Sequence, residues 1–244
     1  MTEFSLYDES AMLYDTHLAQ HFDYKAASER SQSLLNTVAP HAQTLLDLAC
    51  GTGGHLEYFR HRYQCEGLDL SLPMLAQART RLSDVTFHEA NMISFDLGRR
   101  FDVITCMYGS IAFLQTLENV VAMLRCVAGH LHDNGAVLVE PWWAPEQLLE
   151  GEVRVDSTET PDGQIVSMYK IESEGTLSIF DIHYLVCTGA EVQHFVERET
   201  LGLFTREQYL DAFRQAGLTA VFHDVDLFPG HRYGAYLATK TEDT

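Results

Sequence analysis

The chain has 244 residues, of which 46% are hydrophobic, and a formal net charge of −19. This length allows one sizeable core with room for an inserted subdomain. The negative charge disfavours a nucleic-acid or anionic-membrane partner, because both would be repelled. We therefore expect a small-molecule substrate that is neutral or cationic, or one whose phosphates meet a local arginine.

Cysteine and histidine spacing gives no sign of a metal or disulfide framework. The five cysteines lie far apart without a C-x-x-C pair, so we interpret them as reduced core residues. The pair His130-x-His132 precedes the turn 133–135 and suits the last turn of a helix, so no metal is expected. We find no signal peptide and no apolar run that could span a membrane, which makes the cytoplasm the expected location.

The first 143 residues predict a cap followed by an alternating core. Two helical segments are expected near 10–20 and 24–38, in a polar and aromatic stretch. Strand and helix patterns then alternate, which predicts a doubly wound, Rossmann-like parallel sheet with helices on both faces and ligands at the carboxyl ends of its strands. The expected strands are 45–49, 65–70, 85–90, 101–108 and 135–141, and the expected helices are 54–63, 73–82 and 116–131.

After Pro141 the pattern changes to β-branched and aromatic segments separated by turn residues, which predicts an inserted antiparallel sheet. Its expected strands are 152–158, 164–173, 176–187 and 191–200. A helix capped by Thr205 and strands near 218–226 and 233–240 then complete the core. The expected domains are an N-terminal helical cap (1–40), a Rossmann-like core (41–143), the inserted antiparallel β-sheet (144–200) and a C-terminal part that completes the core (201–244).

The glycine-rich stretch L-L-D-L-A-C-G-T-G-G-H-L, residues 45–56, follows the first expected strand. Gly51 and Gly53 allow a tight turn and the close approach of a ligand, with the backbone of Ala49 beside it. Asp69 ends the second strand, where a carboxylate can accept both hydroxyls of a ribose. These features together predict a nucleoside site.

Charge decides which nucleoside is expected. A dinucleotide site has the pattern G-x-G-x-x-G, but the third glycine position here holds Leu56. Asp47 lies just ahead of the loop and would oppose a diphosphate. S-adenosylmethionine carries an ammonium and a sulfonium and has no phosphate, so nearby acids favour it. We therefore expect S-adenosylmethionine, with S-adenosylhomocysteine as product, rather than NAD.

Two further strand ends meet the same rim of the expected sheet. Met107-Tyr108-Gly109-Ser110 ends the fourth strand, next to where the methyl group should project. Glu140, Trp142 and Trp143 end the fifth, and a carboxylate with tryptophans can stabilise a cation. Because adjacent side chains on a strand face opposite ways, one of the two tryptophans is expected in the core.

The pattern D-x-x-C-G-T-G followed by Asp69 resembles the class I methyltransferases. The stretches E-P-W-W at 140–143 and L-F-T-R-E-Q-Y at 203–209 resemble, more narrowly, the bacterial N,N-dimethyltransferases of nucleotide-linked amino sugars such as desosamine and mycaminose. The resemblance runs from about Tyr14 to the C-terminus. It implies a transferase that methylates the amino group of a sugar nucleotide, or another small amine.

The resemblance also implies roles for individual residues. Tyr14, Ser110 and Glu140 would line the cleft as catalytic residues, and Arg232 would meet a substrate phosphate. Phe113 stands where relatives have a histidine near the amine. The implied cofactor-binding residues are Tyr14, Asp47, Ala49, Gly51, Gly53, Asp69, Leu70, Met74, Asn91, Met92 and Met107, with Asn91 and Met92 at the adenine. The implied substrate contacts are Trp142, Trp143, His183 and Arg232.

Methyl transfer from a sulfonium to a neutral amine chiefly needs alignment, so no histidine is expected to be indispensable. Glu140 is expected to stabilise the methylated ammonium. Three alternatives stay open: an O- or N-methyltransferase for another small metabolite, a lyase or cyclase that breaks S-adenosylmethionine, and a non-catalytic binding protein. The inserted sheet must bury one face, so it is expected to cover the cleft or to form a homodimer.

Overall fold

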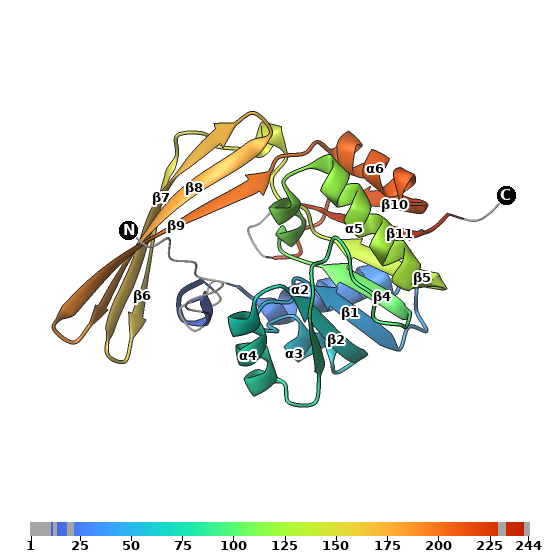
Figure 1. Cartoon of the computed structure of the whole chain (residues 1–244), viewed down its shortest axis with the longest axis horizontal. Helices are drawn as coiled ribbons and strands as arrows, with labels where there is room; N and C mark the ends of the chain where they lie inside the picture. The colour runs from blue at the N-terminus through green and yellow to red at the C-terminus, as the bar shows by residue number, and fades with distance from the viewer. Residues whose placement is uncertain (1–10, 12–13, 19–21, 229–232, 242–244) are drawn as a thin grey trace.

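The structure is a computed structural model, which describes residues 11, 14–18, 22–228 and 233–241. It consists of an α/β core and a separate sheet of four long strands, joined where β5 ends and where α6 begins (Figure 1). This arrangement confirms the predicted fold class, a Rossmann-like sheet with an inserted antiparallel one.

The core sheet has seven strands in the order β10-β11-β5-β4-β1-β2-β3. Strands β1 to β5 are parallel, and β11 runs antiparallel to both β5 and β10. The chain winds from β1 toward β3 on one side and from β4 toward β5 on the other, which opens a crevice at the carboxyl ends of β1 and β4. The bounds are Thr44–Leu48 (β1), Gln64–Asp69 (β2), Thr86–Glu89 (β3), Phe101–Cys106 (β4), Leu131–Val139 (β5), Leu218–His223 (β10) and Ala235–Lys240 (β11).

The helices begin at capping residues that the sequence supplies. The hydroxyl of Ser71 accepts from Met74 N at the start of α4, and Thr205 and Gln208 form a capping box at α6. No helix in the described part of the chain is long and apolar enough to cross a membrane. The bounds are Tyr14–Leu18 (η1, a π-helix), Tyr24–Leu35 (α2), Leu56–Phe59 (α3), Leu72–Arg81 (α4), Ser110–Leu114 (η3, a 3-10 helix), Leu117–His130 (α5), Pro145–Gln147 (η4, also 3-10) and Arg206–Gln215 (α6).

One expected helix is shorter in the structure. The helix expected over 54–63 is confined to Leu56–Phe59, and residues 60–63 form turns that lead into β2. The segment expected near 10–20 is described mainly as the π-helix Tyr14–Leu18.

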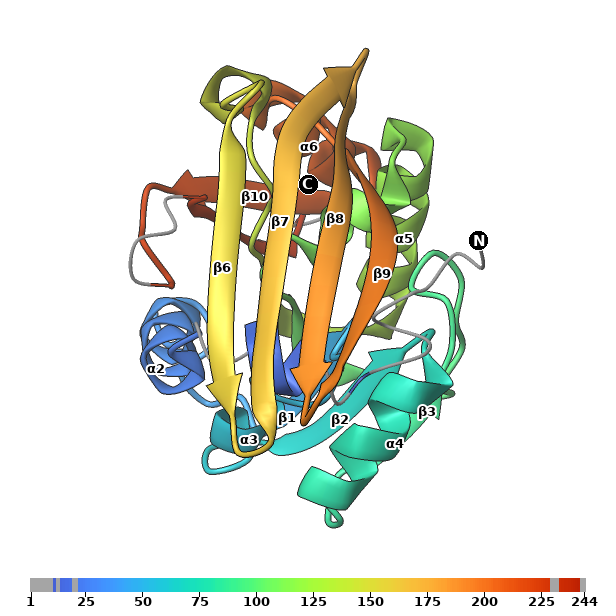
Figure 2. The ribbon, with the colours of Figure 1, turned by 90° about the vertical axis from the view of Figure 1, so that its left-hand side faces the viewer.

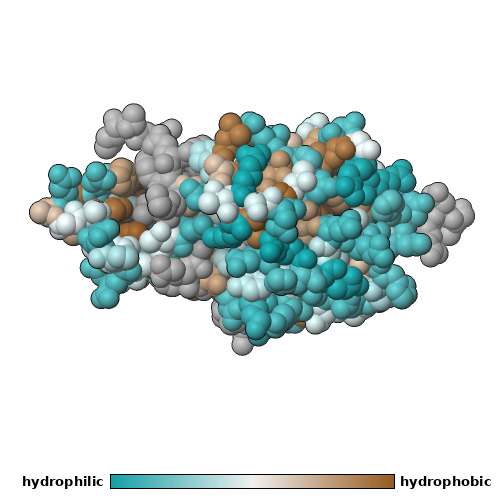
Figure 3. Space-filling model, turned by 90° about the horizontal axis from the view of Figure 1, so that it is seen from below, coloured by the Kyte–Doolittle hydropathy of each residue, from teal (hydrophilic) through white to brown (hydrophobic). Residues whose placement is uncertain are grey.

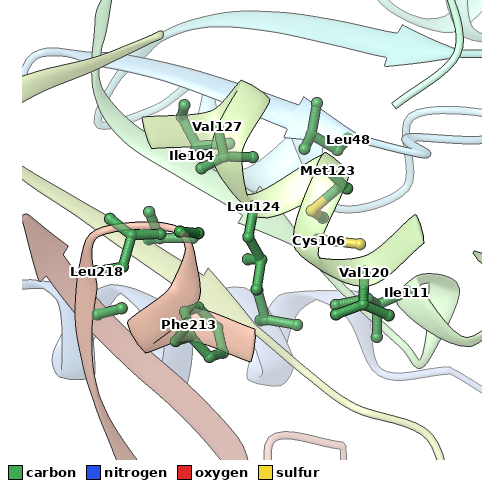
Figure 4. Packing of buried hydrophobic residues seen from close by; sticks show 14 of the residues in the cluster. Leu48, Ile104, Cys106, Ile111, Val120, Met123, Leu124, Val127, Phe213 and Leu218 are labelled. Carbon is green, nitrogen blue, oxygen red and sulfur yellow. The ribbon is translucent and has the colours of Figure 1, made fainter. Parts of the chain in front are cut away.

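Apolar side chains from the core sheet, α5 and α6 form the main core. Ile104 of β4, Val120 and Leu124 of α5 and Phe213 of α6 belong to one apolar cluster, and all four are fully buried (Figure 4). A second cluster covers the opposite face of the sheet, beneath α2 and α3. Two packed faces hold the strand ends rigidly, and rigid strand ends fix the positions of the loops that follow them.

The separate sheet is antiparallel in the order β6-β7-β8-β9. One face turns toward the core, and its fully or nearly buried side chains include Ile171, Phe180 and Tyr184. The other face is not covered by any described element and is the face seen in Figure 2. The bounds are Val153–Thr160 (β6), Gly163–Glu174 (β7), Leu177–Thr188 (β8) and Glu191–Gly202 (β9).

Candidate active site

A cavity of about 410 Å³ lies at the carboxyl ends of β1, β2 and β4. The predicted residues that line it are Tyr14, Asp47, Ala49, Gly51, Asp69, Leu70, Asn91, Met92, Met107 and Ser110. Two predicted cofactor residues do not line it. The backbone N–H of Gly53 donates to Cys50 O and shapes the loop, and Met74 is buried in the first turn of α4.

The loop after β1 depends on glycine at two positions. Gly51 has a φ of +54°, which an L side chain rarely adopts. At Gly54 a Cβ would lie 2.6 Å from the ring of Tyr24, which itself lines the cavity. Any larger residue at position 54 would displace that ring. The loop is therefore shaped both for a tight turn and for close contact with α2.

Asp69 is fixed at the end of β2 by two backbone donors. Its Oδ2 accepts from Gly51 N and its Oδ1 accepts from Ser71 N, each at 2.8 Å. A carboxylate has about four lone-pair positions, so both oxygens can still accept from ribose hydroxyls. The contact with Gly51 also couples the position of the carboxylate to the shape of the glycine loop.

Asp47 is buried beneath the loop, with 2% of its surface exposed. Thr105 Oγ1 donates to its Oδ1 at 2.7 Å. Burial raises the pKa of Asp47 to about 7, and the nearby charge of Asp69 adds to the rise, while the Thr105 hydrogen bond opposes it. A cationic ligand beside it would favour the ionised carboxylate, whereas a diphosphate would face a repulsive charge.

Asn91 is partly engaged before any ligand binds. Its side-chain Oδ1 accepts from Ile93 N at 3.0 Å, which forms an Asx turn after β3. The oxygen can accept a second hydrogen bond, and the amide –NH₂ group stays available as a donor. Asn91 and Met92 both line the cavity, in the place expected for the adenine.

A second cavity of about 400 Å³ lies between the core and the inner face of the four-stranded sheet. Its walls include Trp142, Trp143, Tyr169, Phe180 and Tyr233. The rings of Trp142 and Trp143 lie 4.7 Å apart, and each contacts Phe180. The walls are therefore mostly aromatic, which suits the stacking of a planar or sugar-like group.

The expectation that one tryptophan belongs to the core is wrong, because both line this cavity. Strand β5 ends at Val139, so Trp142 and Trp143 lie in irregular backbone after Pro141 and do not alternate as strand residues do. Trp142 is held there by its indole N–H, which donates to Ser178 Oγ at 3.1 Å.

The two cavities meet at three aromatic residues. Tyr14, Tyr108 and Phe113 line both of them. Burial raises the pKa of Tyr14 to about 12, so its hydroxyl is protonated at neutral pH, and it is hydrogen-bonded to Tyr24. Groups bound in the two cavities would therefore both contact these three residues.

Glu140 does not line either cavity. It is fully buried, and its Oε2 accepts from Tyr108 N at 2.7 Å, while Oε1 has no hydrogen-bond partner among the described residues. Burial raises its pKa to about 8, which leaves the group mostly protonated at neutral pH. The expected role as a cation-stabilising wall is therefore replaced by one in holding the backbone of Tyr108.

His183 faces away from the second cavity. Its neighbours Ile182 and Tyr184 point inward, so the two-residue period of β8 turns His183 to the outer face. There its Nδ1 lies 3.0 Å from His194 Nε2. The predicted substrate contact is therefore wrong for His183. The predicted contact at Arg232 lies outside the described residues.

The π-helix Tyr14–Leu18 joins the two cavities through polar contacts. Asp15 accepts from Thr52 in the glycine loop and forms an ion pair with Arg81 of α4, each at 2.6 Å. On the other side, His17 is fully buried and its ring nitrogens each lie 2.9 Å from a hydroxyl, of Thr158 and of Ser167. The helix that carries Tyr14 therefore bonds to both the core and the four-stranded sheet.

Several cavity residues were not expected from the sequence. His55 lines the first cavity, and burial lowers its pKa to about 3, which keeps its ring neutral. Arg154 and Glu199 line the second cavity from β6 and β9. Alternate residues of a strand face the same side of the sheet, so the sequence divides each strand into two sets of residues. The aromatic residues of β7 and β8 were the only signal for which set faces the cavity.

Comparison with known proteins agrees with this geometry. A methyltransferase-domain profile matches residues 45–135. A dTDP-3-amino-3,6-dideoxy-alpha-D-glucopyranose N,N-dimethyltransferase from Streptomyces fradiae is 38% identical to the chain, over 95% of the chain and 90% of the relative. A dTDP-4-amino-2,3,4,6-tetradeoxy-D-glucose N,N-dimethyltransferase from Saccharopolyspora spinosa is 36% identical, over 88% of the chain and 87% of the relative.

The solved structures give the same result. The crystal structure of DesVI from Streptomyces venezuelae superposes with a TM-score of 0.86 at 34% identity, covering 92% of this chain and 94% of that one. The chain belongs to the family of methyltransferases that includes the dTDP-amino-sugar N,N-dimethyltransferases.

Proposed function

We propose that this enzyme transfers methyl groups from S-adenosylmethionine to the amino group of a dTDP-linked amino sugar, giving the N,N-dimethyl product. The observation that carries the proposal is the junction of the two cavities at Tyr14, Tyr108 and Phe113. One cavity has acids and a glycine loop suited to a cationic nucleoside, and the other is aromatic. The relatives are named for dTDP-linked sugars with the amine at position 3 or 4.

The residues of this chain contribute mainly alignment. When bound, S-adenosylmethionine supplies an electrophilic methyl group on a sulfonium. Asp69 would hold the ribose, and Asp47 would favour the positive charge of the methionine part. Holding the nucleophile and the methyl group in line can supply roughly 7–11 kcal/mol of the barrier reduction. The aromatic residues at the junction exclude water from the reacting atoms.

A direct assay tests the proposal. The protein is incubated with S-adenosylmethionine and dTDP-linked 3-amino or 4-amino deoxysugars, and products are followed by mass spectrometry. We expect S-adenosylhomocysteine together with mono- and dimethylated sugar. Release of homocysteine or methylthioadenosine without any sugar would instead indicate a cleaving enzyme. No turnover with any amine would contradict the proposal.

We also propose that two copies pair through the outer face of the four-stranded sheet. Val155, Met168 and Leu185 lie on this face at 60%, 49% and 46% exposure. Lys170 on the same face already forms an ion pair with Glu172 at 2.8 Å, so the support for pairing comes from the exposed apolar side chains. By contrast, the face in Figure 3 is mostly hydrophilic, with small separate apolar patches.

Light scattering on the purified protein tests this pairing. We expect the mass of a dimer for the wild type and of a monomer for Met168→Glu. The matched control Val221→Glu changes an exposed apolar residue on β10 and should stay dimeric. A monomeric wild type would contradict the pairing.

The enzyme is further proposed to work in the cytoplasm, which the five free cysteines support.

A further inference from the structure

The substrate cavity carries opposite charges at its two edges. Arg154 lies on β6 and Glu199 on β9, which are the two edge strands of the four-stranded sheet. Strands are spaced by about 4.8 Å, so roughly 14 Å separates the two backbones. Among the described residues that line this cavity, Arg154 is the only lysine or arginine and Glu199 the only carboxylate.

Glu199 lies on the side of the cavity where the two sites join. It pairs in register with Phe180, and the carbonyl of the next residue, Thr200, accepts from Gln115 directly after the helix Ser110–Leu114. Its charge also acts on the buried hydroxyl of Tyr14. The carboxylate therefore lies near Tyr14 and Phe113, across from the cofactor cavity.

Arg154 lies at the opposite edge. It pairs in register with Tyr169, and its Nε lies 2.8 Å from Glu152 Oε1. This contact is an ion pair, and the geometry at Nε is not that of a hydrogen bond. The terminal nitrogens of the guanidinium form a fork that matches two oxygens of a diphosphate. Between the two charged residues, Tyr169 and Phe180 line the cavity with aromatic surface.

From this arrangement we propose that Glu199 binds the substrate amine and accepts its proton, while Arg154 binds the substrate diphosphate. The assignment rests on the proposed function and adds the orientation of the substrate within the cavity. It places a molecule with an amine at one end and a diphosphate at the other, with the sugar against the aromatic wall.

The proton balance follows from this placement. The amine nitrogen uses its lone pair to bond the methyl carbon, and the C–S electron pair goes to sulfur. The product is a methylated ammonium with one proton too many for a second transfer. Glu199 takes that proton and, being partly exposed, releases it to solvent. The neutral secondary amine that results can attack a second S-adenosylmethionine.

Three variants and two controls test the assignment, each measured with a dTDP-linked amino sugar and with the same sugar as a methyl glycoside. For Glu199→Gln we expect a 10- to 100-fold loss of kcat, accumulation of the monomethyl product and an unchanged Kd for S-adenosylmethionine. Glu199→Asp should restore part of the loss. For Arg154→Gln we expect a tenfold or larger rise in KM for the dTDP-linked sugar only, with kcat little changed. Glu191→Gln and Arg214→Gln, exposed and away from the cavity, are the controls.

The outcomes separate the two proposals. Absence of wild-type turnover with every amino sugar overturns the proposed function, and the assignment with it. Wild-type turnover with unchanged kinetics in Glu199→Gln or Arg154→Gln overturns the assignment alone. An equal loss in Arg154→Gln for the nucleotide-linked sugar and for the glycoside also overturns it, because a diphosphate contact would affect only the former.

Discussion

Asp15 bonds directly to Thr52, and this contact connects the N-terminal π-helix to the cofactor loop. Oδ1 of Asp15 accepts from the Thr52 hydroxyl at 2.6 Å. The same helix carries Tyr14, which lines both cavities. The position of Tyr14 therefore depends on a hydrogen bond formed beneath the cofactor, and the cofactor site depends on a residue far away in sequence.

Removing this contact should weaken cofactor binding. Hydrogen bonds to charged groups contribute roughly 1.5–3 kcal/mol, and we expect the lower end because Asp15 is partly exposed. Asp15→Asn and Thr52→Val should each weaken the affinity for S-adenosylmethionine about tenfold by calorimetry. The double variant should lose little more than either single one. Additive losses would show that the two residues act separately.

Asp69→Ala should abolish measurable binding of S-adenosylmethionine while the fold survives. Two charge-assisted hydrogen bonds to the ribose are worth roughly 1.5–3 kcal/mol each. Circular dichroism should report an unchanged fold. Because Asp69 also holds Gly51 N and Ser71 N, Asp69→Asn serves as the milder comparison and should bind more weakly than the wild type but better than Asp69→Ala. An unchanged dissociation constant for Asp69→Ala would exclude this ribose site.

Asp47 should make cofactor binding depend on pH. Its pKa of about 7 means that a cationic ligand binds the ionised form and must displace a proton below that pH. The Kd should therefore rise about tenfold per pH unit below 7 and level off above it. In Asp47→Asn this dependence should disappear, which separates it from the titration of the ligand itself. A wild-type Kd that stays constant from pH 5.5 to 7 would contradict the prediction.

Glu140 should lower stability as the pH rises. Its pKa is raised from 4.5 to about 8 on folding, so the folded state keeps a proton that the unfolded state releases between these values. Stability from this group is therefore present below about pH 4.5 and declines up to about pH 8. In urea unfolding, the free energy of unfolding of Glu140→Gln should rise relative to that of the wild type across this range, by at most roughly 1.4 kcal/mol per pH unit. If the difference in unfolding free energy between the variant and the wild type did not change with pH, the pKa of Glu140 would not be raised by burial.

Loss of His183 should not affect catalysis. The side chain faces away from the substrate cavity and contacts His194. We expect kcat/KM of His183→Ala within about twofold of the wild type, with a fall at acidic pH that follows the pKa of the substrate amine. Loss of most of kcat, together with loss of the acidic limb, would show that a histidine base exists.

The fold was predictable because it depends on patterns with strong physical causes. The apolar run 45–48 and the glycines after it indicate a buried strand and a ligand loop, and this local pattern does not depend on the sequence elsewhere in the chain. Asp69 follows from the same logic, since parallel strand ends meet at one edge of the sheet. The antiparallel sheet followed from its turn residues and its aromatic alternation.

The substrate side was less predictable for a physical reason. A strand pattern shows that residues alternate but not which set faces the cleft, so His183 was assigned to the wrong face. Glu140 was expected at the rim, yet the irregular backbone after Val139 places both tryptophans in the wall of the second cavity and leaves Glu140 buried beside Tyr108 N. Arg154 and Glu199 have no local pattern, and only the pairing of strands brings them to one cavity.

Donor and acceptor recognition occupy nearly separate stretches of the chain. The residues that line the cofactor cavity all precede position 115, and most of those on the acceptor side follow position 141. The four-stranded sheet leaves the core at one place and returns at another close by, through β5 and α6 (Figure 1). A single contiguous graft of this segment from a relative would therefore exchange acceptor preference while the methyl-donor machinery stays intact, so this architecture lends itself to diversification by recombination.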